Sequence, residues 1–264
     1  MAAFQEAGHD TQALAWDDPS VNWHEWDAVL IRSTWDYPLR SQEFLDWLTR
    51  IAETTRVINS PEIIRSNLHK SYLLELHGQG IPTVPTQIFT PNQTDQLQDA
   101  IPHLDSDRFV LKPAIGAGSF KTQVFHANQS LEALEFVREH MPNEDFLLQP
   151  YLESVESAGE RALVFINGEI THKVIKQPRF IGQNESVSES LPPTSEEIKL
   201  ANQVLAGYKD LLYARVDVFL NDGQEMLVSE VELIEPSLFL KQNPSAIAKL
   251  VNGASEIALA QLTS

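Results

Sequence analysis

Two pairs of adjacent strands in the second half of the chain constrain its fold most. The segment ERALVFI runs through Asn167-Gly168 into EITHKVIK, and Asn-Gly is the commonest two-residue turn between antiparallel strands. A second pair, LLYARVDVFL and EMLVSEVELIE, is joined by the turn Asn221-Asp222-Gly223-Gln224. Connections this short allow only antiparallel pairing. The second half of the chain is therefore predicted to contain two antiparallel strand pairs.

The beginning of the chain has a different pattern. Strands TQALAW, DAVLIRS and RVINS alternate with the amphipathic helix SQEFLDWLTRIAE, which predicts an α/β layer with parallel strands. A short helical stretch, AAFQEAG, follows Met1, although such a unit normally begins with a strand that leads into this helix. We therefore expect the first strand to be missing, and a change of pattern places a domain boundary near Arg65.

Between these regions the sequence predicts a mixture of strands and helices. A helix is expected over about 68–77, ended by Gly78 and Gly80. Strands follow at RFVLKPA, KTQVFHA and FLLQPYL, with the helix SLEALEFVREHM among them. The polar, proline-bearing stretch 177–194 predicts a mobile loop. Helices are expected at SEEIKLANQVLAGY and over about 244–262.

Charge and composition exclude several classes of protein. The 264 residues include 19 Lys and Arg against 37 Asp and Glu, a net charge of −18, which repels nucleic acids and anionic membranes. The absence of cysteine excludes disulfides, a thiolate nucleophile and cysteine-bound metals. No apolar run approaches the roughly 20 residues that span a bilayer, and no secretory signal is recognisable. We expect a cytoplasmic enzyme or binding protein.

Three acidic residues lie near the ends of the last two strands. Glu230 and Glu232 share one strand face because they are two positions apart, and the turn brings Asp217 beside them. Grouped carboxylates repel one another unless a cation neutralises them, and oxygen ligands suit Mg²⁺. The alternative is that both glutamates occupy a solvated face of an edge strand.

Lys112 and the loop after it form a second candidate site. A lysine inside a strand such as RFVLKPA implies an anionic ligand. Small residues follow in IGAGS, and the backbone N–H groups of Gly116, Gly118 and Ser119 could approach phosphate oxygens closely. A simple hairpin turn explains this loop equally well, and neither common glycine-rich phosphate-binding pattern is present. Lys70 and Lys176, taken alone, are expected to be solvated.

Two strand ends complete the set of candidates. The strand in LLQPYLES breaks at Pro150, and its free backbone groups with Glu153 could hold adenine and a ribose hydroxyl, although an ordinary strand end is the alternative. RSTWDY follows the strand DAVLI at its carboxyl end, where open α/β sheets bind ligands. There Arg32, Ser33 and Tyr37 are candidate substrate-binding residues, and structural packing is the alternative.

Taken in order, these segments resemble a known family. The set SNLHKSYLLEL, VLKPAIGAGS, LLQPYL, GERALVFINGE, VIKQP, ARVDVF and SEVELIEPSLFL is similar to the ATP-grasp superfamily. RSTWDY and ELIEPSLFL resemble the branch of prokaryotic glutathione synthetase ATP-binding domains and D-cycloserine-forming cyclo-ligases. The resemblance implies an N-terminal, Rossmann-like pre-ATP-grasp α/β domain (1–65), a small central α+β subdomain (66–150) and a C-terminal α+β subdomain (151–264), with ATP held between the last two.

The resemblance also implies roles for individual residues. Lys70 and Lys112 resemble the lysines that hold ATP, with Gly116 to Ser119 as the loop over its phosphates. Gln149, Tyr151 and Leu152 resemble the adenine-binding segment, and Glu153 and Glu160 are candidate ribose or cleft contacts. Asp217, Glu230 and Glu232 resemble the magnesium ligands. Arg161, Lys176 and Arg215 resemble residues that stabilise the transferred phosphate or the acceptor carboxylate.

The implied reaction is ATP-dependent ligation of a small carboxylate to an amine through an acyl phosphate, with Mg²⁺, or alternatively Mn²⁺, as cofactor. A homodimer is one assembly we consider. The segment Gln177 to Asn184 departs from the Gly-Asp-Phe-Arg-like stretch common in the family, which leaves the acceptor end of the site open. The competing hypothesis is a non-catalytic nucleotide-binding or scaffold protein with the same fold.

Overall fold

The computed structural model describes residues 1–177 and 186–260, and the chain divides into two compact units. The first unit comprises residues 1–68, 161–217 and 231–264, and the second comprises 69–160 and 218–230. The tip of the last strand pair thus groups with the second unit. The three-part division at 65 and 150 remains a prediction.

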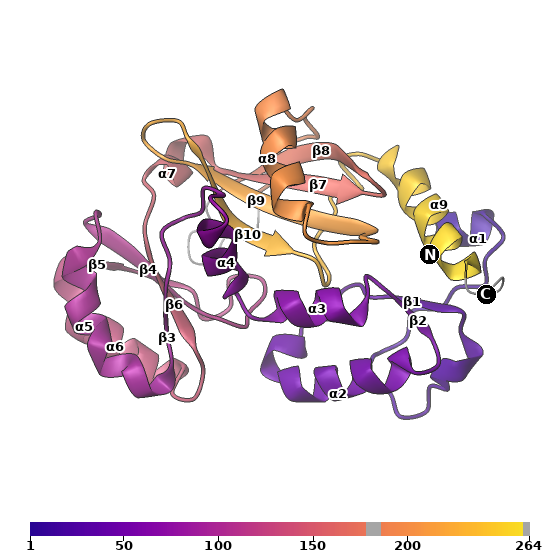
Figure 1. The fold of residues 1–264 in the computed structure, drawn as a ribbon, viewed down its shortest axis with the longest axis horizontal. Helices are drawn as coiled ribbons and strands as arrows, with labels where there is room; N and C mark the ends of the chain where they lie inside the picture. Colours follow the sequence, from indigo (N-terminus) through magenta and orange to yellow (C-terminus); the bar gives the residue numbers. More distant parts are fainter. Residues whose placement is uncertain (178–185, 261–264) are drawn as a thin grey trace. The chain divides into compact units, whose positions relative to one another are not determined.

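The first unit contains a small parallel sheet. Strands β1 (Ala28–Leu30) and β2 (Arg56–Ile58) pair in parallel, with Val29 opposite Val57. The amphipathic helix α2 (Ser41–Ala52) connects them, and α3 (Pro61–Leu68) follows (Figure 1). These four elements match the predicted α/β pattern.

The strand expected at Gln12 to Trp16 is absent, because residues 10–15 are irregular. Leu14 is exposed, and of this stretch only Trp16 is buried. The Trp16 ring packs edge-on against Phe44 and Trp47, and its Nε1 donates to Asp36 Oδ1 at 3.0 Å. The Trp16 side chain thus anchors this segment, in place of the strand pairing that the alternation of polar and apolar residues predicted.

A four-stranded sheet in the order β10–β9–β7–β8 forms the larger framework. The two predicted turns are confirmed. Asn167 and Gly168 have φ angles of 44° and 89°, the left-handed pair that a tight hairpin requires. The strands and the remaining helices of this part are β7 (Glu160–Ile166), β8 (Glu169–Lys176), α8 (Ser195–Leu205), β9 (Tyr213–Leu220), β10 (Met226–Glu232), α9 (Ala246–Leu259) and α1 (Ala2–Glu6), with 3-10 turns at Trp23–Glu25 and Tyr37–Leu39.

The segment expected to be a mobile loop is ordered in the part that the structure describes. Residues 186–191 return antiparallel along β8, with bridges from Lys176 to Val187 and from Lys173 to Leu191. The Ser188 hydroxyl also accepts a bond from the Ile175 N–H at 3.0 Å. Residues 178–185 of the expected loop lie outside the described residues.

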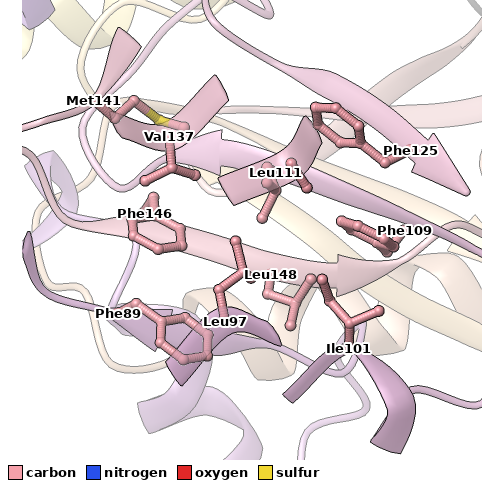
Figure 2. Close-up of a cluster of buried hydrophobic side chains, with 11 residues drawn as sticks. Phe89, Leu97, Ile101, Phe109, Leu111, Phe125, Val137, Met141, Phe146 and Leu148 are labelled. Carbon is pink, nitrogen blue, oxygen red and sulfur yellow. The ribbon is translucent and has the colours of Figure 1, made fainter. Parts of the chain in front are cut away.

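The second unit is an antiparallel sheet with helices on one face. Its strand order is β3–β6–β4–β5, and α5 and α6 cover one side (Figure 1). Phenylalanines and leucines of the strands fill the space beneath these helices (Figure 2). The elements are α4 (Tyr72–Gly78), β3 (Gln87–Phe89), α5 (Leu97–Ala100), β4 (Arg108–Pro113), β5 (Gln123–His126), α6 (Ser130–His140), β6 (Phe146–Pro150) and α7 (Ser154–Ala158), with 3-10 turns at Pro91–Gln96, Ile101–His103 and Ala127–Gln129.

The helix expected over 68–77 is in fact two helices. Helix α3 ends at Leu68 and α4 begins at Tyr72, so Lys70 lies in the break between them. The Lys70 N–H donates to the Ala114 carbonyl at 2.9 Å, a bond that a continuous helix could not make. The break therefore ties this residue to the loop that follows β4.

Close packing of α9 gives a test of the first unit. A Cβ atom added at Gly253 would lie 2.5 Å from Leu212 Cδ1 and 2.7 Å from Asn167 Cγ. We expect Gly253→Ala to destabilise the protein by about 1–3 kcal/mol through this overlap, despite the better helix propensity of alanine. Denaturant midpoints would measure the loss. Gly207, where an added Cβ meets nothing within 4 Å, is the matched control, and equal midpoints for both variants would contradict the packing argument.

Candidate functional site

A buried carboxylate paired with two cations lies at the centre of the first unit's polar cluster. Asp217, on β9, is 1% exposed. Arg215 donates to it through Nε and Nη2, each at 2.8 Å, and Lys176 Nζ donates to Oδ2 at 2.7 Å. A bidentate guanidinium and an ammonium thus satisfy both carboxylate oxygens.

The cations decide the charge state of Asp217. Burial is the largest single influence and would raise the pKa of Asp217, but Arg215 and then Lys176 outweigh it and lower this pKa to about 2. Asp217 is therefore ionised at neutral pH.

The chain after β10 joins this cluster through its backbone. Arg215 also donates to Glu232 and lies 3.5 Å from the Ser237 carbonyl. Arg32 Nη2 donates to the adjacent carbonyl, that of Pro236, at 2.5 Å. The strand exit Glu235-Pro236-Ser237 therefore contacts both arginines, each through a backbone carbonyl.

Arg32 differs from the other two candidates in RSTWDY. Its guanidinium lies 5.3 Å from the centre of the Tyr213 ring, and burial lowers its pKa, although the group remains charged at neutral pH. Ser33 is exposed with φ of 57°. The Tyr37 ring is buried and packs against Phe44 at 5.2 Å between centroids. Arg32 is thus the member of the three that joins the cluster, and Tyr37 contributes its ring to the core.

Arg161 is placed elsewhere in the first unit. Its Nε lies 3.4 Å from Glu197 on α8, and Lys173 Nζ binds the same carboxylate at 2.6 Å. Lys173 and Lys176 are three positions apart on β8, so their side chains point to opposite faces of the sheet. Arg161 therefore belongs to the α8 face, whereas Lys176 reaches Asp217 on the other.

In the second unit, Lys70 connects the small-residue loop to β10. Its Nζ donates to the Gly116 carbonyl at 2.8 Å and lies 3.0 Å from Glu230 Oε1. Lys70 is 6% exposed, so it is not the solvated lysine that its position alone suggested. The pair fixes the start of the loop from which Gly118 and Ser119 project, with φ angles of 61° and 62°.

Lys112 lies on the face of the second sheet that the helices leave uncovered. Leu111 and Leu148 face the helix-covered core, and residues alternate along a strand. Lys112, opposite Leu147, and Gln149, opposite Val110, therefore share the other face. The Gln149 side chain is held by a 2.8 Å bond to Thr86 Oγ1. The half-buried lysine and the buried, fixed amide thus share one face of the sheet.

The segment after β6 is held by Arg108. Its guanidinium stacks over the Tyr151 ring, 4.2 Å from the centroid, and pairs with Glu153 and Glu156. Leu152 is half-buried in this segment. Glu160, at the start of β7, accepts a 2.9 Å bond from Ser229 Oγ. Glu153 and Glu160 thus have partners within the protein, and their ribose roles remain predictions.

Both clusters contain several basic groups although the chain is strongly acidic. In the first unit Arg32, Lys176 and Arg215 lie among Asp217, Glu232 and Glu235, three positive charges against three negative ones. In the second, Lys70 pairs with Glu230. Ammonium and guanidinium groups gathered in this way suit anionic ligands such as phosphate and carboxylate groups.

The three predicted magnesium ligands have basic partners instead. Within residues 1–177 and 186–260, no three His, Cys, Asp or Glu side chains form a group ready to hold a metal ion. Asp217 and Glu232 pair with Arg215, and Glu230 pairs with Lys70. Their assignment as metal ligands remains a prediction.

Sequence reasoning missed the residues that hold the first cluster in place. The Asn59 side chain bonds the backbone of Leu212, Tyr213 and Leu233, at 2.7–3.0 Å. Asn67 bonds Val231 O and Leu233 N, each at 2.8 Å. The available signal was an asparagine at a strand end and another on a helix, Asn59 and Asn67. When such side chains are buried, their amide groups need hydrogen-bond partners.

Comparison with known proteins connects this arrangement to a family. Residues 1–59 match a family model described as the N-terminal domain of D-cycloserine synthetase DcsG. The cycloserine biosynthesis protein DcsG of Streptomyces lavendulae is 27% identical over 274 residues, covering 97% of this chain and 91% of that protein. The crystal structure of D-cycloserine synthetase DcsG superposes with a TM-score of 0.88, at 27% identity, over 97% of this chain and 92% of the other.

More distant structures share the fold. The ATP-grasp ligase PsnB, complexed with a precursor variant, Mg and ADP, has a TM-score of 0.68 at 15% identity, over 97% of this chain and 93% of its own. D-alanyl-alanine synthetase A from Vibrio cholerae has a TM-score of 0.64 at 17% identity, over 90% of this chain and 77% of its own. The chain has the fold of an ATP-grasp ligase. The predicted fold class and the resemblance to ATP-grasp ligases are thereby confirmed.

The pKa of Asp217 gives a test of the first cluster. Because the folded-state pKa is lowered from 3.8 to about 2, ionised Asp217 stabilises the fold at pH above 3.8, and this contribution is lost as pH falls through about 2. The shift corresponds to about 2 kcal/mol. We expect the stability difference between wild type and Asp217→Asn to be largest near neutral pH and to narrow below about pH 4.

Denaturant titrations at a series of pH values would measure this difference. Asp222→Asn, in the exposed turn between β9 and β10, should match the wild type throughout. A difference for Asp217→Asn that stays constant down to about pH 2.5 would show that Arg215 and Lys176 do not hold the carboxylate in this way.

Proposed function

We propose that this protein is an ATP- and Mg²⁺-dependent ligase that joins the carboxylate of a small amino acid derivative to an amine. The class of ligase is supported by the similarity to D-cycloserine synthetase and by the fold that the chain shares with ATP-grasp ligases. The small amino acid derivative is our inference from the similarity to D-cycloserine synthetase along 97% of the chain. We further propose that it acts in the cytoplasm. Among the described residues no helix has the length and apolarity needed to cross a bilayer.

The observation that carries the proposal is the cluster around Asp217. Arg32, Lys176 and Arg215 gather around the carboxylates of Asp217, Glu232 and Glu235. Such a group suits the two anions of the reaction, a transferring phosphoryl group and a substrate carboxylate. A scaffold has no need of this buried and costly arrangement.

The proposed reaction has two steps. A carboxylate oxygen of the acid attacks the γ-phosphorus of ATP, the bond to the β-phosphate oxygen breaks, and ADP leaves. The amine nitrogen then attacks the acyl carbon, inorganic phosphate leaves, and the nitrogen loses a proton. Arg215 and Lys176 would stabilise the negative charge on the phosphoryl oxygens, while Arg32 would bind the acid.

The second unit would hold the nucleotide. Lys112 and Lys70 are the proposed phosphate contacts, and the loop from Gly116 to Ser119 offers backbone N–H groups beside them. Gln149 and the backbone of Tyr151 and Leu152 are the proposed adenine contacts. Each assignment rests on position in the fold and on the charge and exposure described above.

The donor chemistry of the acids fits a divalent cation. Asp217, Glu230 and Glu232 offer only carboxylate oxygens, the ligands that Mg²⁺ prefers, and Mn²⁺ accepts the same set. Bound Mg²⁺ would neutralise charge on the ATP phosphates. The basic partners Lys70, Lys176 and Arg215 would then be released toward phosphate oxygens, since their present carboxylate partners would be shared.

A substrate screen tests the function. ATP, Mg²⁺ and a panel of D- and L-amino acids and their derivatives would be incubated with the protein, and ADP and phosphate measured. Mass spectrometry separates the two forms of ligation, because cyclisation removes one water from a single substrate and condensation joins two. ATP binding without ADP formation across the panel would favour a non-catalytic nucleotide-binding protein.

Glu230 gives a test of the metal role. Glu230→Gln keeps a partner for Lys70 but removes a charged oxygen ligand, so we expect ADP formation to fall by about 10²-fold or more while the protein stays folded. Glu189→Gln, at an exposed position, is the control. Unchanged turnover at saturating Mg²⁺ would remove Glu230 from the metal site.

Lys112 gives a test of the nucleotide role. Lys112→Met removes a charge-assisted contact from a half-buried surface, and we expect the Kd for ATP to rise by about tenfold or more. Lys209, exposed after α8, is the matched control for the loss of one positive charge. Calorimetric titration of both variants measures the effect, and equal affinities would place Lys112 outside the site.

One expected contact falls partly outside the described residues. The position of RSTWDY at the carboxyl end of a strand predicts that the stretch Arg179 to Ser188 approaches it over the bound phosphates. Residues 178–185 lie outside the described residues. The contact remains a prediction.

A further inference from the structure

The Tyr213 hydroxyl joins three strand ends of the first unit. Tyr213 begins β9 and is fully buried. Its oxygen lies 3.1 Å from the Ile31 carbonyl, 3.2 Å from that of Ile58 and 2.8 Å from that of Ile234. These carbonyls follow or end β1, β2 and β10 at their carboxyl ends. The Tyr213 hydroxyl therefore lies where these three strand ends meet, beside the segments RSTWDY and Glu235-Pro236-Ser237.

The ring of the same tyrosine supports Arg32. The guanidinium lies 5.3 Å from the ring centre, and Nη2 donates to the Pro236 carbonyl at 2.5 Å. The hydroxyl has one hydrogen to donate, and it lies within hydrogen-bond distance of the carbonyls of Ile31, the residue before Arg32, and Ile234, two residues before Pro236. Tyr213 thus fixes the backbone on both sides of the Arg32 contact as well as the surface beneath the guanidinium.

Arg32 has one polar atom left for a ligand. Within the part of the chain that the structure describes, its Nη1 is buried and makes no hydrogen bond. A buried donor without a partner destabilises the protein. A substrate oxygen would satisfy it, provided that the guanidinium keeps its direction.

We propose that Tyr213 is a positioning residue that sets the direction of the Arg32 guanidinium and thereby the affinity for the acid substrate. This rests on the proposed function. The phenol remains protonated at working pH, because burial raises the pKa of Tyr213, so its hydroxyl always has a hydrogen to donate. Asn59 holds the Tyr213 carbonyl at 3.0 Å, which keeps the ring in place from the backbone side.

Kinetics of Tyr213→Phe test the proposal, since this change keeps the ring and removes the hydroxyl. We expect the KM for the acid to rise by about tenfold, with the KM for ATP within about twofold of wild type. In an Arg32→Ala background, which itself raises the acid KM, the same change should have almost no further effect because both act through one group. Tyr208→Phe, half-buried after α8, is the control.

Two results would overturn the proposal. The first is additive effects of Tyr213→Phe and Arg32→Ala on the acid KM, and the second is an equal change in the KM for ATP. If Tyr213→Phe does not fold, the KM of Arg32→Lys for the acid tests the proposal instead. The ammonium group of lysine cannot both lie flat on the Tyr213 ring and donate to the Pro236 carbonyl. An acid KM unchanged by Arg32→Lys would then refute it. Wild-type protein that forms no ADP with any acid instead refutes the proposed function.

Discussion

The polar part of the first unit depends on keeping a charge on a carboxylate that has almost no contact with water. Desolvation of such a group costs several kcal/mol unless cations and hydrogen bonds compensate. Arg215 supplies two bonds to Asp217 from the same strand, and Lys176 supplies a third from β8. Because β7 lies between β8 and β9, the lysine side chain reaches across a strand to do so. The ion pair between Lys176 and Asp217 therefore depends on the strand order of the sheet.

This arrangement also gives each acidic candidate metal ligand a partner of opposite charge. Each of the three carboxylates faces a guanidinium or an ammonium within the chain. The basic groups are the same ones that a phosphate would attract. In the function proposed above, binding of ATP with Mg²⁺ would exchange one set of ion pairs for another. Such an exchange would lower the cost of removing these charged groups from water.

The sequence predicted what local patterns determine, and it failed where distant segments meet. Asn167-Gly168 specified its hairpin, and the period of SQEFLDWLTRIAE specified α2, because both depend on neighbouring residues only. The break between α3 and α4 at Lys70 depends on a hydrogen bond to the Ala114 carbonyl. The contacts of the Tyr213 hydroxyl depend on the carbonyls of residues 31, 58 and 234. The false strand at Gln12 had the right alternation but no strand for it to pair with in the described part of the chain.

The same limitation explains the candidates that sequence spacing grouped together. Arg161, Lys176 and Arg215 were equivalent basic residues on neighbouring strands, yet Lys173 and Lys176 point to opposite faces of β8 and separate them. Arg161 and Lys173 both bind Glu197, whose carboxylate also caps α8 through the Thr194 N–H. That face anchors a helix. The other face holds Lys176 and Arg215 with Asp217. The alternation of side chains along β8 therefore separates the cations that anchor α8 from those that pair with Asp217.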